Sequence, residues 1–202
     1  EYGYRANTGI LRESWDEYDF LTEYMSIDKY GNPAWLWNES DFWRTDFTYD
    51  PWGRRTSTTY HDGTRDTSSI SWSDIALYKI WTRNAGERET ETHYDALGRC
   101  VRESDRRFDG SWRHVDTQYN SRGQVWRVSL PHNGTPSQWT TYAYDDFGRQ
   151  VSVTNPNGRV DTAVYDGRRT TKTVAGVTRT TLVDAVGQVK KVTDAAGAVT
   201  ME

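Results

Sequence analysis

The chain has little cysteine and few aliphatic residues, and neither basic nor acidic side chains are in large excess. Hydrophobic residues make up 35% of the 202 residues, and no apolar run approaches the roughly 20 residues that span a bilayer. A single cysteine, Cys100, excludes an intrachain disulfide framework. The 25 basic and 29 acidic side chains give a net charge of −4. The sequence therefore predicts no membrane span and no nucleic-acid partner.

Patterns that carry chemistry are also missing. The four histidines, His61, His93, His114 and His132, are scattered and lack the close spacing of metal ligands. His61 and His132 directly precede Asp-Gly and Asn-Gly turns, so we interpret them as neighbours of turns. The chain has no Gly-x-Ser-x-Gly elbow and no phosphate-binding glycine loop. We therefore predict no catalytic residue, no metal, no cofactor and no enzymatic activity.

Glycine, in contrast, recurs regularly. From Gly86 onward a glycine returns every nine to fourteen residues, and a short polar turn surrounds it. Three turns have the sequence Tyr-Asp-x-x-Gly-Arg, and two looser copies accompany them. The turn residues that we single out are Tyr49, Asp50, Gly53 and Arg54; Tyr94, Asp95, Gly98 and Arg99; Tyr119 and Gly123; Tyr144, Asp145, Gly148 and Arg149; and Asp184 and Gly187.

The spacing within these turns is that of a tight hairpin connection. Asp at the first position can accept hydrogen bonds from backbone N–H groups of its own turn. Gly at the fourth position supplies the left-handed conformation that closes a type I turn with a bulge. A second set of Gly turns, such as His61-Asp62-Gly63, lies between the first. A repeat of about 20 to 25 residues would therefore hold two strands and two turns.

Between the turns, side chains alternate as they do in half-buried strands. Trp126, Val128 and Leu130 fall on one face of an extended segment, with polar neighbours on the other. Helical periodicity is nearly absent. The segment Ile75–Trp81 fits either a short helix capped by Ser73 or a buried strand, and its length favours the strand.

The sequence divides into two parts. Residues 1–48 form an atypical, Trp-rich segment that matches the repeat weakly, and residues 49–202 form the repeat array. Neither end has the special unit that covers the open edge of a repeat array. We therefore expect the chain to be a stretch of a longer protein, with further repeats of that polypeptide as its neighbours.

The Tyr-Asp-x-x-Gly-Arg turns at Tyr94 and Tyr144, with the looser copy at Tyr119 between them at 25-residue intervals, resemble the YD-repeat, or RHS (rearrangement hotspot), family. The resemblance is strongest over residues 88–160. It implies an all-β fold of tandem antiparallel hairpins, which form a curved sheet that is part of a hollow shell. The family includes bacterial polymorphic toxins, B and C components of insecticidal toxin complexes, and animal teneurins.

What the resemblance implies for function is a structural role. In toxin-bearing members the shell encloses a C-terminal toxin domain, which a self-cleaving aspartate site releases near an Asp-Pro-x-Gly-Leu motif. This chain lacks that motif, because Asp50-Pro51-Trp52-Gly53 is followed by Arg54. We therefore expect a non-catalytic scaffold segment of a secreted or cell-surface bacterial protein that encloses a toxin domain.

A carbohydrate-binding or adhesion module that recognises cell-surface glycan is the alternative. Exposed tryptophan and tyrosine rings beside polar groups suit sugar rings. The candidates are Trp35, Trp37, Trp43 and Trp52, which crowd the weakly matching part of the chain. The same rings would also suit stacking across neighbouring strands of a sheet.

Overall fold

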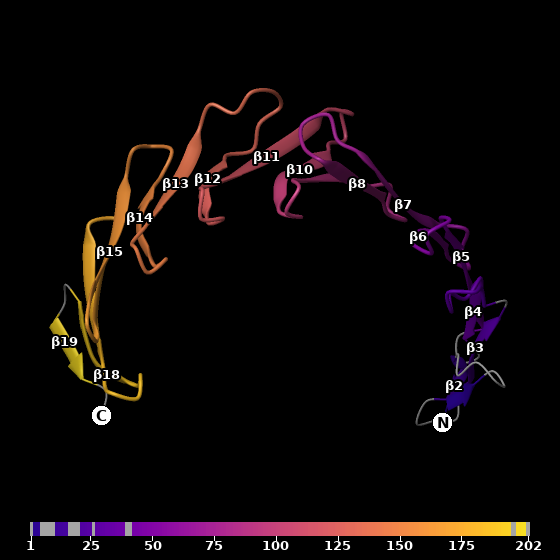
Figure 1. Ribbon diagram of the computed structural model, residues 1–202, viewed down its shortest axis with the longest axis horizontal. Helices are drawn as coiled ribbons and strands as arrows, with labels where there is room; N and C mark the ends of the chain where they lie inside the picture. Colours follow the sequence, from indigo (N-terminus) through magenta and orange to yellow (C-terminus); the bar gives the residue numbers. More distant parts are fainter. Residues whose placement is uncertain are drawn as a thin grey trace. The chain divides into compact units, whose positions relative to one another are not determined.

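The structure is a computed structural model that describes residues 27–38 and 42–194 with their side chains. It also describes the strand backbone of residues 2–4, 11–15, 21–25 and 197–200. Every regular element among these residues is a β-strand, and none of them forms a helix (Figure 1). The predicted all-β fold of tandem antiparallel hairpins is confirmed. Within these ranges no helix could cross a membrane.

The chain divides into two compact units, and the first comprises residues Glu1–Arg99 and Ser104–Gly110. Each strand in it pairs antiparallel with the next strand in the sequence. The result is an open sheet of successive hairpins. Its strands are β1 (Tyr2–Tyr4), β2 (Leu11–Trp15), β3 (Leu21–Met25), β4 (Trp35–Asn38), β5 (Trp43–Tyr49), β6 (Arg55–Thr59), β7 (Arg65–Trp72), β8 (Tyr78–Arg83) and β9 (Glu89–Tyr94).

The second unit comprises residues Cys100–Glu103 and Ser111–Glu202, so that β10 (Cys100–Arg106) contributes residues to both units. Its other strands again pair antiparallel in sequence order. They are β11 (Trp112–Tyr119), β12 (Val125–Ser129), β13 (Trp139–Tyr144), β14 (Gln150–Thr154), β15 (Val160–Asp166), β16 (Arg169–Val174), β17 (Val177–Val183), β18 (Val189–Asp194) and β19 (Gly197–Thr200).

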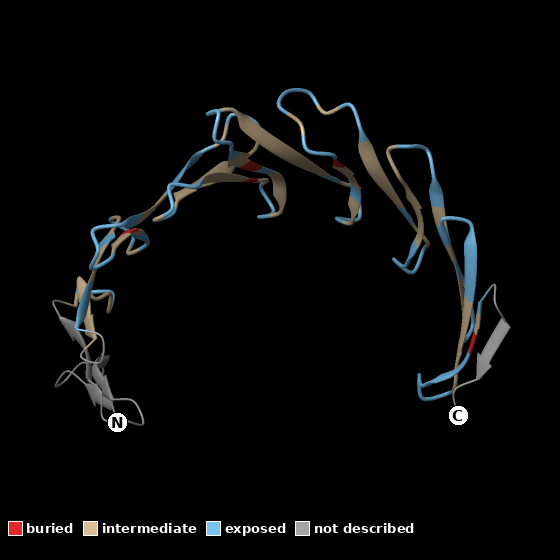
Figure 2. Ribbon diagram, turned by 180° about the vertical axis from the view of Figure 1, so that it is seen from behind, coloured by how far each residue is buried: buried red, intermediate tan, exposed pale blue. Residues whose placement is uncertain are grey.

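Neither unit has a separate buried core among its described residues. Val192 is the one buried apolar side chain there, and the other buried residues are Ser57, His93, Ser104 and Ser129 (Figure 2). Most strand residues are half-buried, because each is covered only by neighbours in its own sheet. Backbone ladders, cross-strand pairs and the turns must therefore supply most of the stability.

The segment Ile75–Trp81, for which the sequence favoured a strand over a short helix, is partly a bend and partly a strand. Residues 74–77 form a bend, and β8 begins at Tyr78. The Ser73 hydroxyl oxygen accepts hydrogen bonds from the N–H groups of Ile75 and Ala76, at 3.1 and 3.0 Å. A serine that was considered as a helix cap therefore caps a hairpin loop instead.

Candidate functional site

The turn at Asp145 shows how each Asp turn is held. The Asp145 carboxylate oxygen Oδ1 accepts hydrogen bonds from the N–H groups of Phe147 and Arg149, at 3.0 and 2.9 Å. The Gly148 N–H donates to the Asp145 carbonyl oxygen at 3.0 Å, and Gly148 has a φ of 80°. One carboxylate thus satisfies the backbone donors that the turn would otherwise leave open.

The arginine that ends the turn makes two further contacts. Arg149 Nε donates to Asp145 Oδ2 at 2.7 Å, and the guanidinium lies 5.1 Å from the Phe147 ring and 4.3 Å from the Tyr165 ring. The ion pair with Asp145 and the contacts with the two aromatic rings therefore hold the Arg149 side chain in one position.

The other turns repeat this geometry with small variations. The carboxylates of Asp50 and Asp95 make the same backbone and arginine contacts as Asp145, with Arg54 and Arg99 respectively. Where arginine is absent, the first-position side chain still accepts the two backbone bonds. These turns begin at Asp28, Asn120 and Asp184.

These contacts also favour the charged form of the turn aspartates. The Arg99 guanidinium and the Arg99 N–H lower the pKa of Asp95 below its usual value. For Asp50 and Asp145 partial desolvation opposes the shift, but hydrogen bonds from their turns outweigh it and the pKa is again lowered. The turns are therefore built around ionised carboxylates.

The motif tyrosines reach back to the preceding hairpin. The Tyr119 hydroxyl donates to the Cys100 carbonyl oxygen, and the Tyr144 hydroxyl donates to the Val125 carbonyl oxygen, both at 2.8 Å. Each acceptor directly follows the last residue of a Gly turn, and each tyrosine lies 19 residues later. The same type of bond joins Tyr49 to Pro33 at 2.9 Å and Tyr165 to Gln150 at 3.1 Å.

A β-bulge accompanies these turns. Ala143 pairs with Ser152 and Tyr144 with Gln150, which leaves Val151 without a partner residue across the ladder. Equivalent shifts lie between Thr48 and Tyr49, between Gln118 and Tyr119, and between Leu182 and Val183. Bulges of this kind increase local twist and bend the strand that carries them.

Neighbouring turns also contact one another along the same edge of each sheet. The Gln124 side-chain amide donates to the Gly148 carbonyl oxygen at 3.3 Å. The Asn32 amide donates to the Gly53 carbonyl oxygen at 3.2 Å. A side-chain amide at the arginine position of the motif thus forms a hydrogen bond to the next turn. The sequence did not predict these bonds, because they depend on which turns become neighbours in the sheet.

The four candidate tryptophans do not form one platform. Trp35 and Trp37 lie on one face of β4, and the pairing of Trp37 with Arg44 places Arg44 on that face. Trp43 pairs with Asn38 and therefore belongs to the opposite face. The Arg44 guanidinium covers the Trp35 ring at 4.7 Å.

The other two candidates are the exposed ones. Trp43 is 51% exposed, and its ring stacks on His61 with centroids 3.9 Å apart. Trp52 is 74% exposed and lies in the Asp50 turn, where the Arg54 guanidinium approaches its ring to 5.0 Å.

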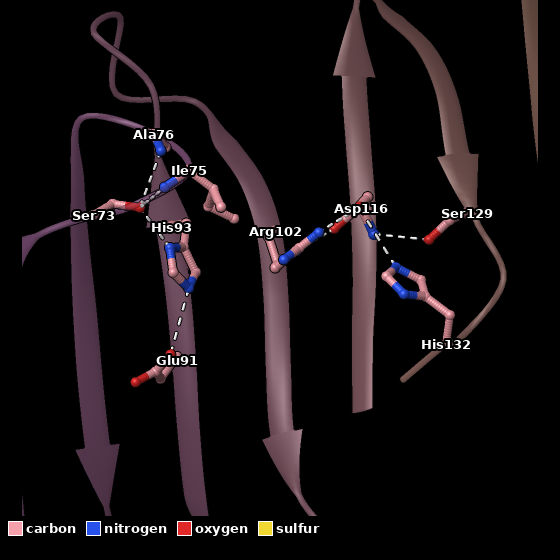
Figure 3. Close-up of polar contacts among 9 residues, drawn as sticks. All are labelled: Ser73, Ile75, Ala76, Glu91, His93, Arg102, Asp116, Ser129 and His132. Carbon is pink, nitrogen blue, oxygen red and sulfur yellow. Dashed lines mark hydrogen bonds and ion pairs between the residues drawn. The ribbon is translucent and has the colours of Figure 1, made fainter. Parts of the chain in front are cut away.

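Two further polar clusters lie outside the motif (Figure 3). In the first unit His93, which is 4% exposed, lies between Ser73 and Glu91. The Ser73 hydroxyl oxygen is 2.7 Å from His93 Nδ1, and Nε2 is 3.5 Å from the Glu91 carboxylate. Burial lowers the pKa of His93.

Serine, histidine and glutamate are also the residue types of hydrolytic triads, but Ser73 has another task here. Its oxygen already accepts two backbone N–H bonds, so its hydroxyl proton is directed to His93. A nucleophilic serine needs a free oxygen lone pair near a site for the substrate carbonyl. The geometry therefore fits a structural role, in which Ser73 and His93 hold the β7–β8 loop in place.

The second cluster lies in the second unit. Arg102 and Asp116 form a two-pronged ion pair, in which Nη2 is 2.8 Å from Oδ2. The Asp116 N–H donates to the buried Ser129 hydroxyl oxygen at 2.8 Å. His132 is packed beside them with a side chain only 10% exposed, and its Nε2 is 3.5 Å from Asp116 Oδ2.

The histidines are not arranged as metal ligands within the part of the chain that the structure describes. The rings of His114 and His132 lie 5.7 Å apart, and the two residues exchange backbone hydrogen bonds. No group of three or more His, Cys, Asp or Glu residues among the described side chains is placed to hold a metal ion.

Comparison with known proteins agrees with this geometry. Residues 119–160 and 144–178 match the RHS repeat family. No curated protein matches the chain in sequence. The crystal structure of TcdB2-TccC3 is similar with a TM-score of 0.78 and 14% identity, over 96% of this chain and 14% of that one. The crystal structure of TcdB2-TccC3-TEV gives 0.75 and 11%, over 96% and 16%.

The hairpins and their Asp turns define a β-repeat protein. At such low identity the two crystal structures support the fold alone, and this chain spans only 14% and 16% of the chains that it matches. The match of residues 119–178 supports an RHS/YD-repeat segment there, and the two crystal structures show the same fold over most of the chain.

Proposed function

We propose that the chain is a non-catalytic structural segment of a large secreted or cell-surface RHS/YD-repeat protein. In this proposal its hairpins contribute to a β shell that encloses a C-terminal toxin domain. The remaining repeats of the same polypeptide would be its immediate partners.

The observation that carries the proposal is the bond between successive hairpins. The hydroxyls of Tyr119 and Tyr144 each bind a carbonyl oxygen next to the preceding Asp or Asn turn of the repeat. Each repeat is thereby fixed to its predecessor by a contact that the next repeat can make again. Such nearest-neighbour contacts allow a ribbon to be extended without a conventional core.

The motif residues have structural roles in this proposal. Asp and Arg hold each turn, Gly supplies the positive φ, and Tyr ties the turn to the previous hairpin. Similarity to the crystal structures named TcdB2-TccC3 supports a place in a larger repeat assembly. The same comparison supports the secreted or surface location in this proposal.

Limited proteolysis of the full-length polypeptide tests the proposal. We expect its C-terminal region to resist protease while the array is intact, and to become cleavable when Asp95 and Asp145 are both replaced by alanine. Asp146→Ala is the control, because that side chain is 96% exposed beside Asp145. A C-terminal region that is cut equally fast in the wild-type protein and in the double variant would overturn the proposal.

A further inference from the structure

One face of strands β5 to β8 in the first unit carries a groove. The cavity has a volume of about 490 Å³ and is lined by residues of these strands and their turns. Cross-strand pairing puts Phe47 opposite Thr58, and Thr58 opposite Asp66. Ser68 pairs with Thr82 on the same face. The size is that of pockets that hold small ligands.

The charges that line the groove are paired, with one exception. Asp66 accepts a hydrogen bond from the Tyr60 hydroxyl at 2.6 Å and from the Ala85 N–H at 2.7 Å. Arg83 donates to the Glu87 carboxylate at 3.0 Å. Because these groups already have partners, they offer little to a ligand.

Arg55 is the exception. Its guanidinium lies 5.2 Å from the centroid of the Phe47 ring, and no carboxylate or carbonyl among the described residues accepts its N–H groups. Arg55 is exposed at the groove, so its donors face solvent. A guanidinium suits planar, two-pronged recognition of a carboxylate.

The rest of the lining suits the polar and apolar sides of a sugar ring. The hydroxyls of Thr45 and Thr58 flank Phe47, and neither hydroxyl has a hydrogen-bond partner among the described residues. The Phe47 ring offers a weakly negative face to the C–H groups of a pyranose. Trp43 lies on the same face of β5, two positions beyond Thr45.

We propose that this groove binds a short saccharide that carries a carboxylate, such as a uronic acid. The carboxylate binds Arg55, the ring packs at Phe47, and the threonine hydroxyls bond to ring hydroxyls. A plain inorganic anion would use Arg55 alone and leave the aromatic and hydroxyl groups without a role. The inference does not rest on the proposed shell function, because it concerns one face of the first unit.

Binding of tri-galacturonic acid to the whole chain, followed by NMR titration, tests this site. We expect its fully methyl-esterified form, which has the same rings without the charges, to bind about tenfold more weakly. Arg55→Gln should lose the preference for the acid, and Phe47→Leu should weaken the binding of both saccharides. Arg127→Gln is the control, because Arg127, like Arg55, lies over aromatic rings but belongs to the second unit.

Three results would overturn the inference. The acid and its ester could bind equally well, Arg55→Gln could leave the preference intact, or inorganic sulfate could displace the saccharide at equal concentration. Circular dichroism of each variant verifies that the sheet is retained. Arg55 is exposed and forms no ion pair with any residue that the structure describes, so its replacement should leave folding intact.

Discussion

Gly187 closes its turn with a φ of 87°, a conformation that residues with a Cβ adopt at a cost. A Cβ built there would meet nothing within 4 Å, so strain alone would act. We expect Gly187→Ala to lower the free energy of unfolding by about 1 kcal/mol. Gly134→Ala is the matched control, because Gly134 has equal space and no positive φ. Urea melts that shift equally for both variants would contradict this account.

His93 should make stability depend on pH above the range where carboxylates titrate. Burial, together with the charge of Lys79, lowers its pKa, while Glu91 and Asp74 oppose the shift. The folded chain therefore binds this proton less readily than the unfolded chain does. Stability is complete above the unfolded pKa of about 6.5 and falls as the pH drops below it.

The test is a urea melt of the wild-type chain and of His93→Gln at pH 7.5 and 5.5. Glutamine can still accept a hydrogen bond from Ser73 but does not titrate. We expect the wild type to lose more stability than the variant between the two pH values. Equal losses would show that His93 does not contribute, since both chains share every other histidine.

At the scale of the element, the hairpins depend on bonds between a tyrosine and the preceding turn. Tyr144 shares β13 and one of its faces with Tyr142, whose hydroxyl has no hydrogen-bond partner in the described residues. Tyr144→Phe leaves the Val125 carbonyl oxygen without its donor and should cost about 1 kcal/mol. Tyr142→Phe should cost much less, and guanidinium melts of both variants measure the difference. A similar cost for both would exclude the hydroxyl bond as the cause.

The turns could be predicted from the sequence because their contacts are local. Asp145, Gly148 and Arg149 lie within five consecutive positions, so chain geometry alone brings them together. The carbonyl partner of Tyr144 could not be predicted in the same way. It lies 19 residues away and is selected by the register of two hairpins, which a bulge then shifts.

Contacts that depend on strand register also decide the placement of the tryptophans and the conformation of the β7–β8 loop. Sequence proximity suggested that Trp37 and Trp43 act together, but the pairing of β4 with β5 puts them on opposite faces. A one-residue change of register would have reversed that result. Ser73 was recognised as a cap, yet His93, which holds it, lies 20 residues further along the chain.

At the scale of the whole molecule, the repeated use of ionised aspartates should make both units sensitive to acid. The pKa is lowered for Asp28, Asp50, Asp62 and Asp95 in the first unit and for Asp145 and Asp161 in the second. A lowered pKa means that the folded chain holds fewer protons. Stability is therefore present above the unfolded value of about 3.9 and is lost as the pH falls through the folded values.

Asp145→Asn and Asp146→Asn separate this effect from general acid denaturation. Both remove one negative charge from the same turn, but only Asp145 accepts the backbone bonds of Phe147 and Arg149. Asparagine keeps an oxygen acceptor, as Asn120 does in its own turn. In urea melts between pH 5 and pH 2.5 we expect Asp145→Asn to be less stable at pH 5 and to lose less stability on acidification. Asp146→Asn should follow the wild-type curve, and parallel curves for all three chains would mean that the turn carboxylates do not set the acid limit of the fold.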